Sequence, residues 1–131
     1  MPLNILGGLI AVFIALILYS IGAWAAFRAR AFSNRTLMFL WVGAVFDVLA
    51  TFLMGMSIGG LDLRPGIHIV HTVLALVAMF GMIIVTAVAQ WATATKRQAA
   101  AVTLSRVVLA PWALWAGVFV FGMIAQGPHA G

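Results

Sequence analysis

Long apolar runs separated by short polar segments dominate the chain. Four such runs, at about residues 3–27, 36–58, 67–91 and 107–125, contain between them a single charged residue, Asp47. Each run is long enough to cross a hydrocarbon core of about 30 Å as an α-helix. A backbone within lipid must satisfy its own N–H and C=O groups, and the runs lack the alternation of barrel strands. The pattern therefore predicts an all-α integral membrane protein, a bundle of four transmembrane helices joined by short loops.

The composition agrees with this architecture and argues against a water-soluble fold. Of the 131 residues, 66% are hydrophobic and 7% are charged, and the mean hydropathy is +1.21. Four spans use most of the chain, so we expect one domain, residues 1–131, without an extramembrane domain. The chain has no cysteine, which excludes disulfides, thiolate metal sites, iron–sulfur clusters and covalently attached haem.

The basic residues predict the orientation of the spans. The first and third loops hold or adjoin six of the seven basic residues, namely Arg28, Arg30, Arg35, Lys96, Arg97 and Arg106. Because these loops lie on the same side, the positive-inside rule places both in the cytoplasm and both termini outside. We therefore expect a multi-pass protein of the bacterial inner (cytoplasmic) membrane. The net charge of +5 then reflects topology, and we expect no nucleic-acid partner.

The tryptophans support the same orientation. Four of them fall toward the helix ends nearest the two basic loops: Trp24, Trp41, Trp91 and Trp112. Tryptophan is enriched where a membrane meets water. We expect these residues to form an aromatic belt on the cytoplasmic side.

Asp47 is an acidic residue inside a predicted span. It lies about 11 residues from either end of the second run, which is near mid-depth at 1.5 Å per residue. Burying a carboxylate there costs several kcal/mol, so one hypothesis is a proton-linked or ligand-binding carboxyl. The alternative is a neutral Asp47 that joins two helices by a hydrogen bond. Thr51, one turn further along, and Tyr19 and Ser20 of the first run are candidate partners.

Two histidines form a second candidate site near the start of the third run. His68 and His71 are three residues apart, on neighbouring parts of one helix face. Such residues can ligate a b-type haem or a pigment, or carry protons. A bis-histidine haem requires a second helix, and the remaining histidine, His129, lies beyond the fourth run. Interfacial histidines bonded to water or headgroups are the simpler alternative, and we expect no metal site here.

Glycine and proline predict local packing features. Gly55 and Gly59 form a GxxxG motif, which permits close approach of another helix within the bundle or from a second copy. Pro111 has no N–H for the carbonyl of Val107. We therefore expect a kink near the start of the fourth helix.

A set of residues spread along the chain carries a family resemblance. It comprises Tyr19, Ile21, Gly22, Trp24, Trp41, Gly43, Asp47, Thr51, Met54, Trp112, Trp115, Gly122 and Met123, with His68 or His71 opening the third helix. The most specific part is the run Trp41-x-Gly43-x-x-x-Asp47-x-x-x-Thr51. Through these residues the chain resembles the HsmA-like family of small four-helix prokaryotic membrane proteins, which implies the same fold and places the intramembrane acid of that family on Asp47. Further histidines of the family correspond here to Thr36, Met82 and Ser105, so the resemblance implies the fold and no particular activity.

These features favour a non-enzymatic function. The chain contains no recognisable Ser/His/Asp arrangement, paired carboxylates or glycine-rich phosphate loop. We expect an accessory or structural subunit of a homo- or hetero-oligomeric membrane assembly. The subunit would contact the lipid bilayer and either its own copies or a larger complex. Two alternatives stay open: a small proton-linked transporter or channel using Asp47, and a b-type haem or pigment-binding protein using His71 or His68.

Overall fold

A computed structural model describes residues 3–58 and 65–125, which are helical apart from short turns. The helices are α1 (Leu3–Ala29), α2 (Asn34–Ile58), α3 (Ile67–Ala94), α4 (Gln98–Val107) and α5 (Leu109–Ala125). In this part of the chain, α1, α2, α3 and the combined α4 and α5 are each long and apolar enough to cross a membrane. The structure thus confirms the predicted all-α bundle with four membrane-spanning segments.

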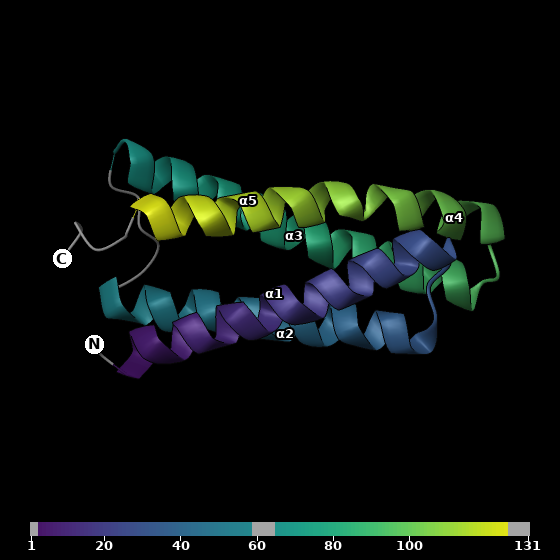
Figure 1. Ribbon diagram of the computed structural model, residues 1–131, viewed down its shortest axis with the longest axis horizontal. Coiled ribbons are helices and arrows are strands. Elements are labelled where there is room, and N and C mark those ends of the chain that lie inside the picture. Colours follow the sequence, from purple (N-terminus) through teal and green to yellow (C-terminus); the bar gives the residue numbers. More distant parts are fainter. Residues whose placement is uncertain (1–2, 59–64, 126–131) are drawn as a thin grey trace.

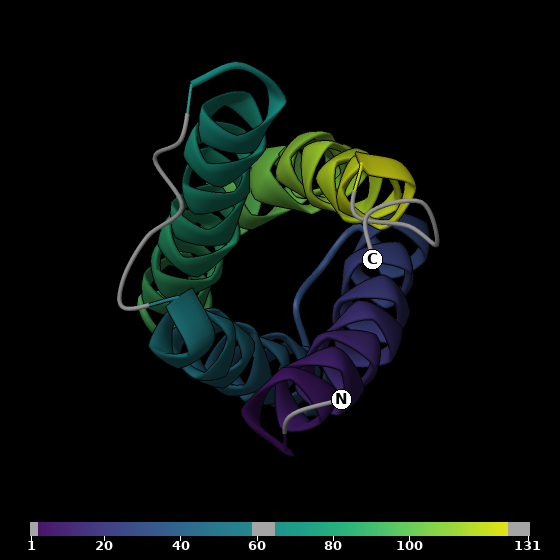
Figure 2. The same cartoon turned by 90° about the vertical axis from the view of Figure 1, so that its left-hand side faces the viewer.

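The spans run in alternating directions, so both basic turns lie at one end of the bundle (Figure 1). We call this end, on the right in Figure 1, the basic end. It carries Arg28, Arg30, Arg35, Lys96, Arg97 and Arg106. Seen along the bundle, α1, α2, α3 and α5 surround the interior (Figure 2), and the contact between α1 and α2 is the most extensive of any pair.

Local hydrogen bonds keep both turns at the basic end short. Ser33 caps α2, because its hydroxyl accepts the backbone N–H of the residue three positions on at 3.1 Å. The end of α3 is a Schellman motif, in which Lys96 adopts a left-handed φ of 57°. The N–H of Lys96 donates to the Thr93 carbonyl at 3.2 Å, and that of Arg97 donates to the Ala92 carbonyl at 2.8 Å.

The helices extend further toward the basic end than predicted. The third helix continues to Ala94, and the fourth span begins at Gln98 rather than near residue 107. Hydropathy detects the apolar part of a helix and misses a polar extension. Residues 98–107 include three consecutive alanines, and alanine is the strongest helix former. As a result, Arg106 lies within α4 and not in a loop.

The fourth span is interrupted close to Pro111, where the sequence predicts a kink. α4 ends at Val107, Val108 forms a turn, and α5 begins at Leu109. Proline cannot donate to the Val107 carbonyl. The neighbouring bonds persist, since the N–H of Val108 donates to the Leu104 carbonyl at 2.9 Å. The chain therefore continues in the same general direction as a second helical segment.

The buried face of α1 consists of small residues and one large one. Its buried members are Gly8, Ala11, Ala15, Tyr19, Gly22, Ala23 and Ala26. Small side chains let membrane helices approach closely, which explains the intimate contact with α2. Tyr19 is the largest of the completely buried side chains in the described part of the chain. Large apolar side chains such as Ile17, Val45, Phe52 and Phe80 are instead exposed on the outside, where lipid would surround them.

Candidate functional site

Asp47 lies at the centre of a hydrogen-bonded cluster that three helices build. Its carboxylate Oδ2 accepts a hydrogen bond from the Tyr19 hydroxyl at 3.1 Å and another from the Trp115 indole N–H at 2.9 Å. Tyr19 is on α1, Asp47 on α2 and Trp115 on α5, and none of the three is more than 5% exposed. We call these three residues the Asp47 cluster. It connects α2 to both α1 and α5.

The two aromatic donors of the cluster also support each other. The rings of Tyr19 and Trp115 meet edge to face, with centroids 5.3 Å apart. Trp115 in turn stacks on Phe119, one helical turn further along α5, with centroids 6.0 Å apart. Aromatic contacts of this kind are worth about 0.5–1.5 kcal/mol beyond the burial of their area. The ring packing therefore holds both donor groups in position toward the carboxylate.

Gly43 leaves space on α2 for the Tyr19 ring, because it has no side chain. It lies one helical turn before Asp47, and a Cβ atom added there would be 2.8 Å from Cδ1 and 3.1 Å from Cε1 of Tyr19. Those distances are shorter than van der Waals contact between carbon atoms. Only glycine admits the ring this close to α2, and this approach lets the Tyr19 hydroxyl reach Asp47.

Two other predicted partners of the Asp47 carboxyl bind elsewhere. The Thr51 hydroxyl donates to the backbone carbonyl of Asp47 at 3.0 Å and lies 3.8 Å from Sδ of Met79. Threonine in a helix commonly bonds to the carbonyl four residues back, so its position on the same face does not bring it to the carboxyl. The Ser20 hydroxyl accepts the indole N–H of Trp112 at 3.1 Å. Of the three partners expected from the sequence, Tyr19 alone reaches the carboxyl.

Trp115 is the site residue that the sequence did not assign to Asp47. One signal for it was present. Trp115 lies inside the fourth span, away from the helix ends where tryptophan meets headgroups, and a buried indole N–H requires an acceptor. Asp47 is a strong acceptor at mid-depth. The indole N–H of Trp115 and the carboxylate of Asp47 are thus matched in depth and in hydrogen-bonding character.

The tryptophans near the basic end differ in the contacts that they make. Trp41 on α2 donates its indole N–H to Oε1 of Gln90 on α3, and Trp112 joins α5 to α1 through Ser20. These two side chains connect helices. Trp91 is 51% exposed, and the guanidinium of Arg97 lies 5.0 Å from its ring centroid. Trp91 is therefore the member that best fits the predicted belt.

His71 packs against α5. Its ring stacks on Phe121 with centroids 5.8 Å apart, and a Cβ atom at Gly122 would lie 2.4 Å from its Nε2. Gly122 therefore makes room for the imidazole. His68, one turn earlier on α3, is also partly exposed. Both histidines lie in the first turns of α3, toward the end opposite the basic end.

Two predictions fall partly outside the described residues. His129, on which a bis-histidine haem would depend, lies beyond residue 125. Gly59 of the predicted GxxxG motif lies in the segment 59–64, whereas Gly55 is partly buried near the end of α2. The haem and GxxxG interpretations therefore stay predictions.

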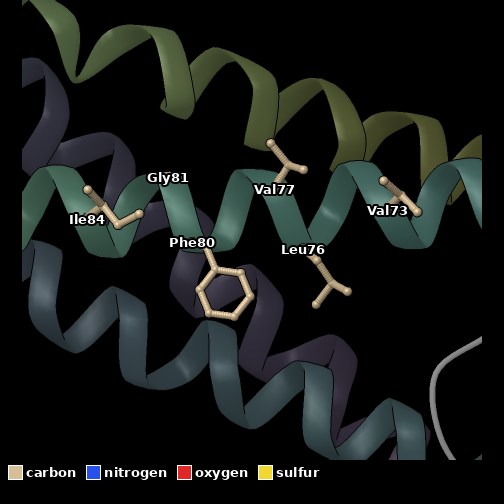
Figure 3. Close-up of a pocket in the computed structure, with 6 residues that line it drawn as sticks. All are labelled: Val73, Leu76, Val77, Phe80, Gly81 and Ile84. Atoms are coloured by element: carbon tan, nitrogen blue, oxygen red, sulfur yellow. The ribbon is translucent and has the colours of Figure 1, made fainter.

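An apolar hollow opens on the outward face of α3 (Figure 3). It has a volume of about 510 Å³ and is lined by Val73, Leu76, Val77, Phe80, Gly81 and Ile84. Leu76 and Phe80 point away from Val77. At Gly81 the helix lies close to α5, because a Cβ atom there would be 3.2 Å from Cβ of Pro111. The hollow contains no member of the Asp47 cluster.

Comparison of the chain with protein-family models, curated proteins and solved structures found no match. The resemblance to the HsmA-like family therefore stays a prediction. The four apolar spans indicate a small membrane protein, and any finer assignment rests on the geometry described above.

Proposed function

We propose that the chain is a non-enzymatic accessory or structural subunit of a membrane assembly, formed with its own copies or with a larger complex. The observation that carries this proposal is the engagement of the Asp47 carboxylate by Tyr19 and Trp115. An acid inside a span is the first place to look for chemistry. Here that acid accepts hydrogen bonds from two other helices, which is a structural use of a polar group in lipid.

In this proposal, other protein chains bind to the outer surface of the bundle. Membrane helices associate through close van der Waals packing, since lipid tails are as apolar as the side chains themselves. The hollow on α3 is an indentation in such a surface, and Val77 at its lining is 53% exposed. We propose that a helix of a second copy packs against this face.

The native mass of the protein tests this proposal. We expect an assembly larger than the single 13.9 kDa chain, measured by native mass spectrometry in mild detergent and by crosslinking in intact membranes. Val77→Trp fills the hollow and should weaken the assembly. Val45→Trp is the matched control, because Val45 is 64% exposed on α2 and does not line the hollow. A single chain in both membranes and detergent would contradict the proposal.

We further propose that the basic end faces the cytoplasm of a bacterial inner membrane. The support is the collection of six of the seven basic residues at that end. Positively charged loops are retained on the cytoplasmic side during insertion. In this orientation the histidines of α3 lie toward the outer side.

A second candidate function is a small proton-linked transporter or channel. The observation in its favour is the direct contact of two ionisable side chains, Tyr19 and Asp47, inside the spans. Asp47→Asn keeps an acceptor oxygen for both donors and removes the exchangeable proton. Under this candidate, proton flux into proteoliposomes, followed with a pH-sensitive dye, disappears in Asp47→Asn while the variant stays folded. Flux equal to that of the wild type would eliminate a proton-carrying Asp47.

A further inference from the structure

Three arginines and an aromatic ring surround a cavity at the basic end. The cavity has a volume of about 400 Å³ and is lined by Phe27, Arg28, Arg30 and Arg106. Arg28 lies in the last turn of α1, and Arg30 follows that helix with a φ of 54°. Arg106 lies in the last turn of α4. Two segments far apart in the sequence thus bring three exposed guanidinium groups to one opening.

No carboxylate of the described residues balances this charge. The chain has two acidic residues. Asp47 is buried and bonded to Tyr19 and Trp115, and Asp62 lies outside the described ranges. Like charges around one opening repel each other, and each guanidinium presents five N–H donors that suit phosphate or carboxylate oxygens. An anion from outside the chain would offset this repulsion.

An aromatic group adjoins the arginines toward the interior of the span. Phe27 meets Trp24 edge to face with ring centroids 5.7 Å apart, and Trp24 meets Trp112 in the same manner at 5.6 Å. Trp24 and Phe27 are 37% and 39% exposed. Tryptophan and basic residues together at the end of a span are typical of the headgroup level of a membrane. If these rings lie at that level, the cavity opens at the depth of the headgroup phosphates.

We propose that Arg28, Arg30 and Arg106 bind the phosphate of an anionic phospholipid, with an acyl chain of that lipid lying along Phe27 and Trp24. Arginine donates paired hydrogen bonds to phosphate oxygens. Free phosphate offers the same oxygens and has no chain to cover the exposed rings, so the geometry favours the lipid. Basic pockets at the cytoplasmic face of a membrane suit anionic headgroups. This site is consistent with the proposed orientation of the basic end and is independent of the proposed subunit role.

Lipid binding to matched charge variants tests the site. We expect native mass spectrometry to show that the wild type binds phosphatidylglycerol at least about tenfold more tightly than phosphatidylcholine. The triple variant Arg28→Gln, Arg30→Gln, Arg106→Gln should lose this preference. The control variant Arg35→Gln, Lys96→Gln, Arg97→Gln removes the same charge from the same end without changing the cavity lining, and it should retain the preference.

Removal of three charges also weakens the signal that orients the spans, and a triple variant could therefore insert or fold incorrectly. A single substitution tests the site without this complication. Arg106→Gln alone should lower the affinity for phosphatidylglycerol by about threefold to tenfold. Brominated phosphatidylglycerol should also quench the tryptophan fluorescence of the wild type more than brominated phosphatidylcholine does. Equal losses in both triple variants, or equal affinity of the wild type for the two lipids, would overturn the site. Displacement of the lipid by millimolar inorganic phosphate would overturn its assignment to lipid.

Discussion

Asp47→Ala is expected to lower the free energy of unfolding of the bundle by about 1–3 kcal/mol, and Asp47→Asn by less than about 1 kcal/mol. Alanine leaves the Tyr19 hydroxyl and the Trp115 N–H buried without their acceptor. Asparagine keeps an oxygen at the same place and can accept both bonds. Unfolding of the purified protein in mixed micelles of mild detergent and dodecyl sulfate measures the difference.

A double-mutant cycle separates the hydrogen bond from other effects of the substitution. Tyr19→Phe removes the hydroxyl and keeps the ring. Combined with Asp47→Ala, it should show a coupling free energy of about 0.6 kcal/mol, the average for interhelical hydrogen bonds in membranes, and at most about 1.7 kcal/mol. Thr51→Val is the control, since its hydroxyl bonds to the backbone of Asp47 and not to the carboxyl. An Asp47→Asn variant as unstable as Asp47→Ala would show that the acceptor oxygen is not what stabilises the bundle.

The spans and the position of Asp47 could be predicted because both depend on local sequence. The length of an apolar run sets the number of crossings, and the place of an acid within a run sets its depth. The partners of Asp47 depend on which helices meet. Trp115 is on α5, 68 residues away along the chain, and no helical periodicity connects it to α2. Thr51 was predicted to bond to the Asp47 carboxyl because it lies on the same helix face. Its hydroxyl instead donates to the backbone carbonyl of Asp47.

The basic end shows why polar helices are difficult to predict from hydropathy. Because the fourth apolar run begins near residue 107, Arg106 was expected beside a loop. In the structure α4 extends the fourth span back to Gln98, and the helix fixes Arg106 across from the end of α1. Its approach to Arg28 and Arg30 is therefore a result of tertiary structure. The charge count predicted the side of the membrane, whereas the cavity emerged only from the packing of α1 against α4.

Gly43→Ala is expected to lower the free energy of unfolding by about 1–3 kcal/mol, the usual cost of overpacking a core. The new Cβ atom would lie 2.8 Å from a ring carbon of Tyr19, and the completely buried ring has no flexible end that can move away. Gly117→Ala is the matched control. It adds the same methyl group inside a span, and no atom lies within 4 Å of the new Cβ. Both substitutions carry the same gain in helix propensity, so their difference measures the contact with Tyr19.

Removing the Tyr19 ring should rescue Gly43→Ala. In a Tyr19→Ala background the added methyl group no longer meets the ring, so its cost should fall to that of Gly117→Ala. The same reasoning connects Gly43 to Asp47. If the methyl group pushes the ring outward, the Tyr19 hydroxyl loses the carboxylate, and Tyr19→Phe should then cost less in the Gly43→Ala background than in the wild type. Equal costs of Gly43→Ala and Gly117→Ala in the same unfolding assay would contradict this, because they would mean that α2 tolerates a side chain at Gly43 without moving Tyr19 from Asp47.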